Sequence, residues 1–96
     1  MTERIIVRHH PNSDANSFDV FYPEETANLG RIVCQQVDCL GDNRFNIWSH
    51  DEACYDYYLE CRPVSKELSM RFATMLSGHY GTQFVAAQRI NWKKRH

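Results

Sequence analysis

Four cysteines are the residues of this chain best suited to chemistry, because thiols form disulfides, bind metal ions and act as nucleophiles. Cys54 and Cys61 bracket the stretch CYDYYLEC and are seven residues apart. An extended segment of that length spans about 23 Å, whereas the Cα atoms of a disulfide lie within about 7 Å of each other. Cys34 and Cys39, which are five residues apart, meet the same objection if they lie on a strand. We therefore expect four reduced thiols that pack as small hydrophobic side chains.

The histidines and cysteines show none of the tight pairs, such as Cys-x-x-Cys, that structural zinc sites use. His9 and His10 are adjacent, so on a strand their side chains would point apart. A cross-strand metal site that joins Cys34, Cys61 and a histidine is compatible with the spacing, as is a cysteine nucleophile activated by a histidine. Nothing in the sequence marks which cysteine or which base would serve. We therefore predict no catalytic residues, no metal and no other cofactor.

Acidic residues provide the other candidate chemistry. The pairs Glu24-Glu25 and Asp51-Glu52 fall in predicted loops, where carboxylates are usually solvated. A general acid and base would need a cleft that perturbs their pKa values. The four glycines are scattered along the chain, so the sequence contains no glycine-rich phosphate-binding loop. An enzyme with a Cys–His or acidic site in a cleft between sheet and helix is therefore an alternative hypothesis, behind a binding role.

Composition bounds the class of protein. The 96 residues suffice for a single domain, residues 1–96, with a hydrophobic fraction of 43% and a formal net charge of −1. That charge argues against a protein that binds nucleic acid through bulk electrostatics. The basic end WKKRH, residues 92–96, supports a third hypothesis, nucleic-acid binding through the C-terminal strand and tail. We rank it below protein binding, because a terminal basic run is usually solvated charge.

The sequence predicts no membrane partner, because no apolar run approaches the ~20 residues of a membrane span. The opening segment MTERIIVRHH has charges among its first four residues, and its apolar run is too short for a signal peptide. We therefore expect a cytoplasmic protein, which agrees with the expectation of reduced cysteines.

Alternating apolar residues predict the strands that would position these side chains. The expected strands are residues 4–9, 18–22, 29–37, 44–49 and 54–61, and the expected turns include residues 40–43 and 50–52. The segment 24–40 is ambiguous, because Leu29, Val33 and Val37 also fit a helical stripe. We predict a strand there, because LGRIVCQQ follows a turn-like EETAN and resembles the return strand of a hairpin.

One amphipathic helix is predicted over residues 65–77. Its apolar stripe comprises Leu68, Phe72, Met75 and Leu76. Ser65 suits the N-cap position and Gly78 suits the position after the last turn. Alternation resumes after the helix and predicts a final strand at about 82–92.

The expected fold is α+β, with an antiparallel meander of about five strands, the helix on one face and the final strand. A helix of about 13 residues is ~20 Å long and covers three or four strands spaced ~4.8 Å apart. It protects one face only, so the other face stays open unless something docks on it. The side chains expected to face the helix are Val7, Val20, Ile32, Phe45, Ile47, Tyr57 and Leu59. Those expected on the open face are Arg8, Asp19, Phe21, Arg31, Val33, Asn46, Trp48, Tyr58 and Glu60.

This open face is the predicted binding site, because interfaces are enriched in aromatic residues and arginine. We expect a small, non-enzymatic interaction module of the accessory or inhibitor type. Its partner is another protein or a second copy of the chain in a homodimer, a common way to cover such a face. In the alternative, loops or the N-terminus fold over the face and make it a second core. The predicted contact residues are Phe21, Arg31, Trp48 and Tyr58.

Overall fold

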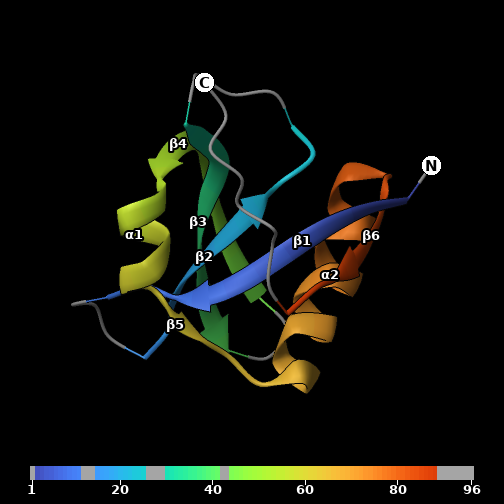
Figure 1. Ribbon diagram of the computed structural model, residues 1–96. Helices are drawn as coiled ribbons and strands as arrows, with labels where there is room; N and C mark the ends of the chain where they lie inside the picture. The colour runs from blue at the N-terminus through green and yellow to red at the C-terminus, as the bar shows by residue number, and fades with distance from the viewer. Residues whose placement is uncertain (1, 12–14, 26–29, 42–43, 89–96) are drawn as a thin grey trace.

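The computed structural model describes residues 2–11, 15–25, 30–41 and 44–88, and it confirms the α+β class. A six-stranded sheet carries a helix on each face (Figure 1). The strands are β1 (Thr2–His9), β2 (Ser17–Tyr22), β3 (Arg31–Gly41), β4 (Arg44–Cys54), β5 (Arg62–Pro63) and β6 (Gln83–Ala86). The helices are α1 (Tyr55–Glu60) and α2 (Lys66–Tyr80). Within the described ranges, no helix is long and apolar enough to cross a membrane.

Strands β1 to β4 form the predicted antiparallel meander, with the spatial order β4-β3-β2-β1. The outer edge of β1 carries two short strands, of which β5 pairs antiparallel with its end and β6 pairs parallel with its beginning. Helix α2 connects β5, beside the end of β1, to β6, beside its beginning. As a result, β1 begins, and β2 and α2 end, at the same upper end of the molecule (Figure 1).

Local signals position the start of α2 as predicted, but not its end. Ser65 is the N-cap, and its Oγ accepts a hydrogen bond from the Leu68 amide at 3.2 Å. The helix continues through Gly78 to Tyr80, and Gly81 forms the left-handed cap at a φ of 68°. The prediction that Gly78 ends the helix is wrong, because an interior glycine costs a helix only about 1 kcal/mol, which packing can offset.

The strand predicted within the ambiguous segment is confirmed, since β3 spans Arg31–Gly41. The predicted turn at residues 50–52 is wrong, because β4 continues to Cys54 and pairs with β3 along that length. The final strand is shorter than predicted, with Gln83–Ala86 in β6, and residues 89–92 lie outside the described part of the chain.

The prediction of a fifth strand at CYDYYLEC is also wrong, because residues 55–60 form helix α1. Extended backbone would point Tyr57 and Tyr58 to opposite sides, whereas one helical turn directs both toward the sheet. Tyr58 is buried against Phe21, and the two rings meet edge to face with centroids 5.1 Å apart. Tertiary packing of these aromatic rings therefore outweighs the β propensity of the tyrosines.

Two hydrophobic clusters lie on opposite sides of the sheet. The first face, which α2 covers, holds Ile5, Val7, Phe18, Val20, Tyr22, Val33, Val37, Phe72, Ala73 and Leu76. The second face, which α1 covers in part, holds Ile6, Phe21, Ile32, Cys34, Ala53, Tyr58 and Cys61. The predicted orientations of Ile32 and Val33 are therefore wrong, because Val33 pairs with Tyr22 and both face α2. Leu59, which we expected in the core, is exposed on α1.

A β-bulge in β4 interrupts the alternation of side chains just after Trp48. Gln35 pairs with His50 and Val37 pairs with Ile47, so a single residue of β3 lies opposite two residues of β4. A bulge of this kind changes which face the neighbouring side chains occupy. Ile47 packs on the first face and Trp48 lines a hollow on the second, as alternation predicts. Beyond the bulge, His50 lies against Tyr22 of the first face instead of sharing the face of Trp48.

Candidate functional site

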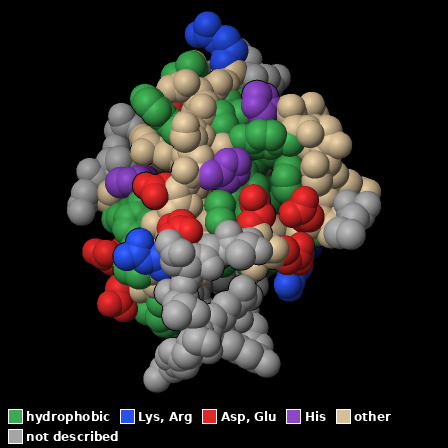
Figure 2. Space-filling model, turned by 90° about the horizontal axis from the view of Figure 1, so that it is seen from above, with side chains coloured by type: hydrophobic (Ala, Val, Ile, Leu, Met, Phe, Trp, Pro, Cys, Tyr) green, Lys and Arg blue, Asp and Glu red, His purple; other side chains and the backbone are tan. Residues whose placement is uncertain are grey.

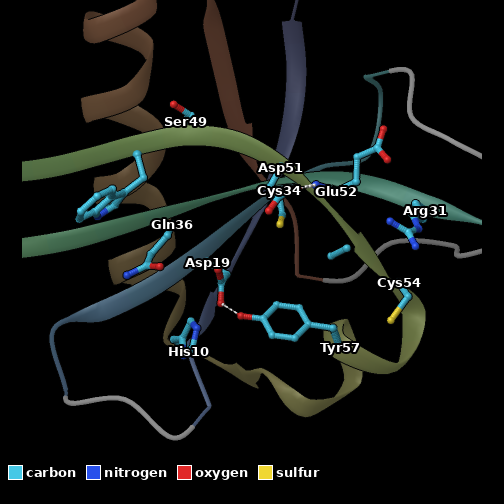
Figure 3. A pocket seen from close by; sticks show the side chains of 12 residues that line it. His10, Asp19, Arg31, Cys34, Gln36, Ser49, Asp51, Glu52, Cys54 and Tyr57 are labelled. Atoms are coloured by element: carbon cyan, nitrogen blue, oxygen red, sulfur yellow. Dashed lines mark hydrogen bonds between the residues drawn. The ribbon is translucent and has the colours of Figure 1, made fainter.

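Beside α1, the second face contains a hollow of about 620 Å³, hereafter the second-face hollow (Figure 3). Helix α1 has only 6 residues and leaves part of this face uncovered, because β3 and β4 have 11 residues each. The side chains that line the hollow include His10, Asp19, Cys34, Trp48, Asp51 and Tyr57. The hollow thus combines aromatic, acidic and thiol groups contributed by several elements of the fold.

Trp48 is exposed at the hollow but is fixed in place. Trp48 is 52% exposed, and its indole N–H donates a hydrogen bond to Asp38 Oδ2 at 3.0 Å. Burial raises the pKa of Asp38, but hydrogen bonds from Trp48, Gln36 and Ser17 outweigh this effect and lower the pKa overall. Asp38 is therefore ionised at neutral pH and provides a strong acceptor that orients the indole.

Asp19 forms a buried acidic group in the hollow, and its residue is only 3% exposed. Its Oδ2 accepts hydrogen bonds from the Tyr57 hydroxyl at 2.6 Å and from Cys61 Sγ at 3.6 Å. Figure 3 shows the Tyr57 ring reaching from α1 toward Asp19. Burial, followed by the hydrogen bond to Asp19, raises the pKa of Tyr57, and burial raises the pKa of Cys61 to about 12. Both donors therefore keep their protons at neutral pH.

Arg8 lies directly opposite Asp19 in the β1–β2 pairing and attaches α1 from the neighbouring strand. Its two terminal nitrogens donate to the Cys61 carbonyl oxygen at 3.1 Å and to the Tyr58 hydroxyl at 2.8 Å. Its guanidinium carbon also lies 4.2 Å from the Tyr58 ring centroid, within the range of a cation–π contact. The short helix is thus held by two charged residues of the sheet.

Cys34 and His10 line the same hollow, which is the residue combination that the enzyme hypothesis requires. Burial, and then the nearby charges of Asp19 and Asp51, raise the pKa of the Cys34 thiol to about 12. A nucleophilic cysteine needs the opposite shift, because only the thiolate attacks. The Cys34 thiol therefore keeps its proton at neutral pH and is not activated as a nucleophile.

The predicted contact residues divide into two groups. Phe21 and Tyr58 are buried, at 0% and 4% exposure, so the expectation that both lie on an open face is wrong. The physical reason is that α1 covers them, which corresponds to the alternative of a second core. Arg31 is exposed and lines the second-face hollow together with Trp48. The uncovered part of the second face therefore keeps two of the four predicted residues.

Sequence reasoning missed His10, Asp51 and Tyr57 as parts of this site, and it placed Asp19 only on an open face. A signal for Asp19 was present, because it is the single charged residue in the otherwise apolar strand FDVFY. A carboxylate between buried side chains requires hydrogen-bond donors. Here Tyr57 and Cys61 are the donors, and both belong to the segment 54–61 that we predicted to be a strand.

Within residues 2–11, 15–25, 30–41 and 44–88, no group of three or more His, Cys, Asp or Glu side chains is placed to hold a metal ion. The basic tail, residues 92–96, lies outside the described residues. Comparison of the chain with protein-family models, curated proteins and solved structures finds no match in any of the three. Function is therefore inferred from the geometry of the molecule alone.

Proposed function

We propose that the protein is a non-enzymatic interaction module that binds a basic segment of a partner protein in the second-face hollow. The observation that carries the proposal is Trp48, an indole that is exposed and yet oriented by Asp38. An immobilised aromatic side chain beside a hollow suits a binding hot spot, because little side-chain entropy is lost when the partner docks. An accessory or inhibitor role would use such a surface.

The charges of the hollow support a basic partner. Among the described residues, its lining includes three carboxylates, Asp19, Asp51 and Glu52, and one arginine, Arg31. Opposite charge across an interface speeds association and selects the partner. A guanidinium or ammonium group could also stack on the Trp48 ring, which is the best aromatic partner for a cation.

The same charges favour a different protein over a second copy of the chain. In a twofold dimer the same surface patch meets itself, so Asp51 and Glu52 would lie near their own images. Like charges brought together across an interface cost free energy. A homodimer remains an outcome that a solution mass measurement would reveal.

A cytoplasmic location belongs to the proposal. All four cysteines are free thiols, and thiols persist in reducing compartments.

Titration with a hexa-arginine peptide tests the proposal. The chain has two tryptophans, so a Trp92→Phe background makes Trp48 the sole indole reporter. We expect saturable fluorescence changes that weaken steeply as salt is added, because exposed charges are screened beyond about 10 Å at 0.1 M salt. The chain alone should have the solution mass of a monomer.

Matched variants locate the binding surface. Asp51→Asn combined with Glu52→Gln should weaken binding at least about tenfold, as expected for loss of close interfacial charge pairs. Glu60→Gln removes an exposed carboxylate outside the hollow and should leave binding unchanged. Equal affinities for both variants, or no binding by the parent chain, would refute the proposal. A dimer that Trp48→Ala dissociates would replace the basic partner with a second copy.

A further inference from the structure

Four aromatic side chains lie in a cycle on the first face, each beside the next, at the end of the molecule where α2 ends. They belong to Tyr22, His50, Tyr80 and Phe84, and are hereafter called the aromatic cage. Successive ring centroids around the cage are 4.9, 6.0, 6.4 and 5.8 Å apart. The cage lines a hollow of about 220 Å³, which is smaller than the ~300 Å³ at which pockets for drug-sized ligands begin. The hollow is therefore large enough for a small ligand group, but not for a drug-sized molecule.

Gln35 holds two of the rings from below. Its residue is 1% exposed, and its Oε1 accepts a hydrogen bond from the Tyr22 hydroxyl at 2.6 Å. Its Nε2 donates to the Tyr80 hydroxyl at 2.6 Å and to the Trp48 carbonyl oxygen at 2.8 Å. Both tyrosine hydroxyls are thus hydrogen-bonded to Gln35, and both tyrosines line the hollow with their aromatic rings.

The helix end positions the Phe84 ring. Gly81 adopts the left-handed conformation and turns the chain directly from α2 into β6. Ser77 then joins the two elements, because its hydroxyl donates to the Ala73 carbonyl oxygen at 2.6 Å and accepts from the Phe84 amide at 2.8 Å. Phe84 therefore faces the last residue of the helix, Tyr80, across the cage.

Two carboxylates complete the site. Glu3 comes from β1, and Glu25 follows β2 in a turn that its amide closes on the Tyr22 carbonyl oxygen at 3.2 Å. The neighbouring Glu24 is held away by an ion pair with Arg4 at 2.7 Å. Burial raises the pKa of Tyr22, and the nearby Tyr80, Glu25 and Glu3 raise it further. Acidic side chains also lie along one side of the hydrophobic and histidine side chains on this end of the molecule (Figure 2).

We infer that the aromatic cage binds a methylated ammonium group, with the rings contacting the methyl groups and the two glutamates supplying the opposite charge. Aromatic faces attract cations, and several rings together recognise quaternary ammonium groups. A primary ammonium group carries three N–H donors that would need acceptors. The tyrosine hydroxyls are already engaged by Gln35, so Glu3 and Glu25 are the charged acceptors left for such donors. A quaternary ammonium group needs no acceptor, and its methyl groups pack on the ring faces, so we expect the cage to prefer the methylated form.

This inference goes beyond the proposed function, because the cage lies on the opposite face from the second-face hollow and does not depend on it. Free choline and a trimethylated lysine in a protein share the same head group. Their relative affinities therefore identify the source of the ligand.

Titrations of the full chain with tetramethylammonium, choline and N-acetyl-trimethyllysine amide test the inference. We expect each to shift the ring protons of Tyr80 and Phe84 in NMR spectra. The control is 3,3-dimethyl-1-butanol, which has the shape of choline without its charge, and N-acetyl-lysine amide tests the selection for methyl groups. The neutral alcohol should bind at least about tenfold more weakly, because a desolvated cation–π contact contributes about this much for each good ring. The lysine amide keeps its charge and should also bind more weakly, because its ammonium group is strongly hydrated. Equal binding of the neutral alcohol, or no ring shifts with any cation, would overturn the inference.

Paired variants separate recognition from folding. Tyr80→Leu removes a cage ring and should weaken choline binding about tenfold or more, whereas Tyr80→Phe keeps the ring and should stay within about threefold. Circular dichroism verifies that each variant is folded. Glu3→Gln combined with Glu25→Gln leaves all four rings in place and should also weaken binding, while Glu60→Gln should not. Choline affinity that is unchanged in the Glu3→Gln, Glu25→Gln double variant would contradict the charge requirement.

Discussion

At the scale of single residues, one acid and one base of the sheet determine how the second face is covered. Asp19 accepts hydrogen bonds from Tyr57 and Cys61, and Arg8 donates to the carbonyl oxygen of Cys61 and the hydroxyl of Tyr58. These contacts join residues that are 38 to 53 positions apart in the chain. Charged side chains in the middle of a sheet therefore act here as attachment points for a short helix.

The Asp19 contact predicts a measurable coupling. Asp19→Ala leaves the Tyr57 hydroxyl without its acceptor and should lower the free energy of unfolding by about 1–3 kcal/mol. Tyr57→Phe alone should cost about 1 kcal/mol. In urea unfolding of both single variants and the double variant, we expect a coupling energy of at least about 0.5 kcal/mol. Strictly additive effects would show that the hydrogen bond contributes nothing to stability.

The buried thiols predict how stability depends on alkaline pH. Burial raises the pKa values of Cys34 and Cys61 from 9.0 to about 12. Above pH 9 the unfolded chain loses these protons while the folded chain keeps them, so the unfolded state binds fewer protons and stability falls. The contribution is therefore complete below about pH 9 and is lost as pH rises toward about 12.

Urea unfolding at a series of pH values measures this loss. Replacing Cys34 and Cys61 by alanine removes both titrating groups and should flatten the decline between about pH 9 and pH 12, even though the variant starts from lower stability. An equally steep decline in the variant would assign the alkaline transition to other groups.

At the scale of elements, the parts predictable from sequence are those whose signals are local. Ser65 and the apolar stripe beside it lie within one helix, so α2 could be predicted from its own residues. The segment CYDYYLEC could not, because its helical form depends on Phe21 and Asp19 in another strand. The bulge at Trp48 depends likewise on the register that β3 imposes on β4. Two of the four predicted contact residues, Phe21 and Tyr58, are buried because this segment forms α1 and covers the second face.

The two glycines near the end of α2 give opposite predictions. Gly78 lies inside the helix, and a Cβ added there would meet no neighbouring element within 4 Å, so Gly78→Ala should stabilise the fold by about 0.5–1 kcal/mol. Gly81 has a φ of 68°, so Gly81→Ala should destabilise it by about 1–2 kcal/mol. Thermal unfolding of both variants measures the difference, and a shift of the same sign in both would contradict this assignment of the helix end.

At the scale of the whole molecule, the sheet separates two hollows of different chemistry. The second-face hollow exists because α1 is too short to cover β3 and β4, and the aromatic cage lies where α2 ends and the chain turns into β6. Both hollows contain carboxylates. We infer that the fold serves to present these hollows to cationic groups, with a protein partner assigned to the second face.

Backbone amide NMR during a titration with hexa-arginine tests whether the second-face hollow is the binding site. We expect the shifted amides to cluster around this hollow, at Cys34, Trp48, Asp51 and Tyr57, while α2 is unaffected. Shifts confined to α2 or to the aromatic cage, or no shifts at all, would contradict it.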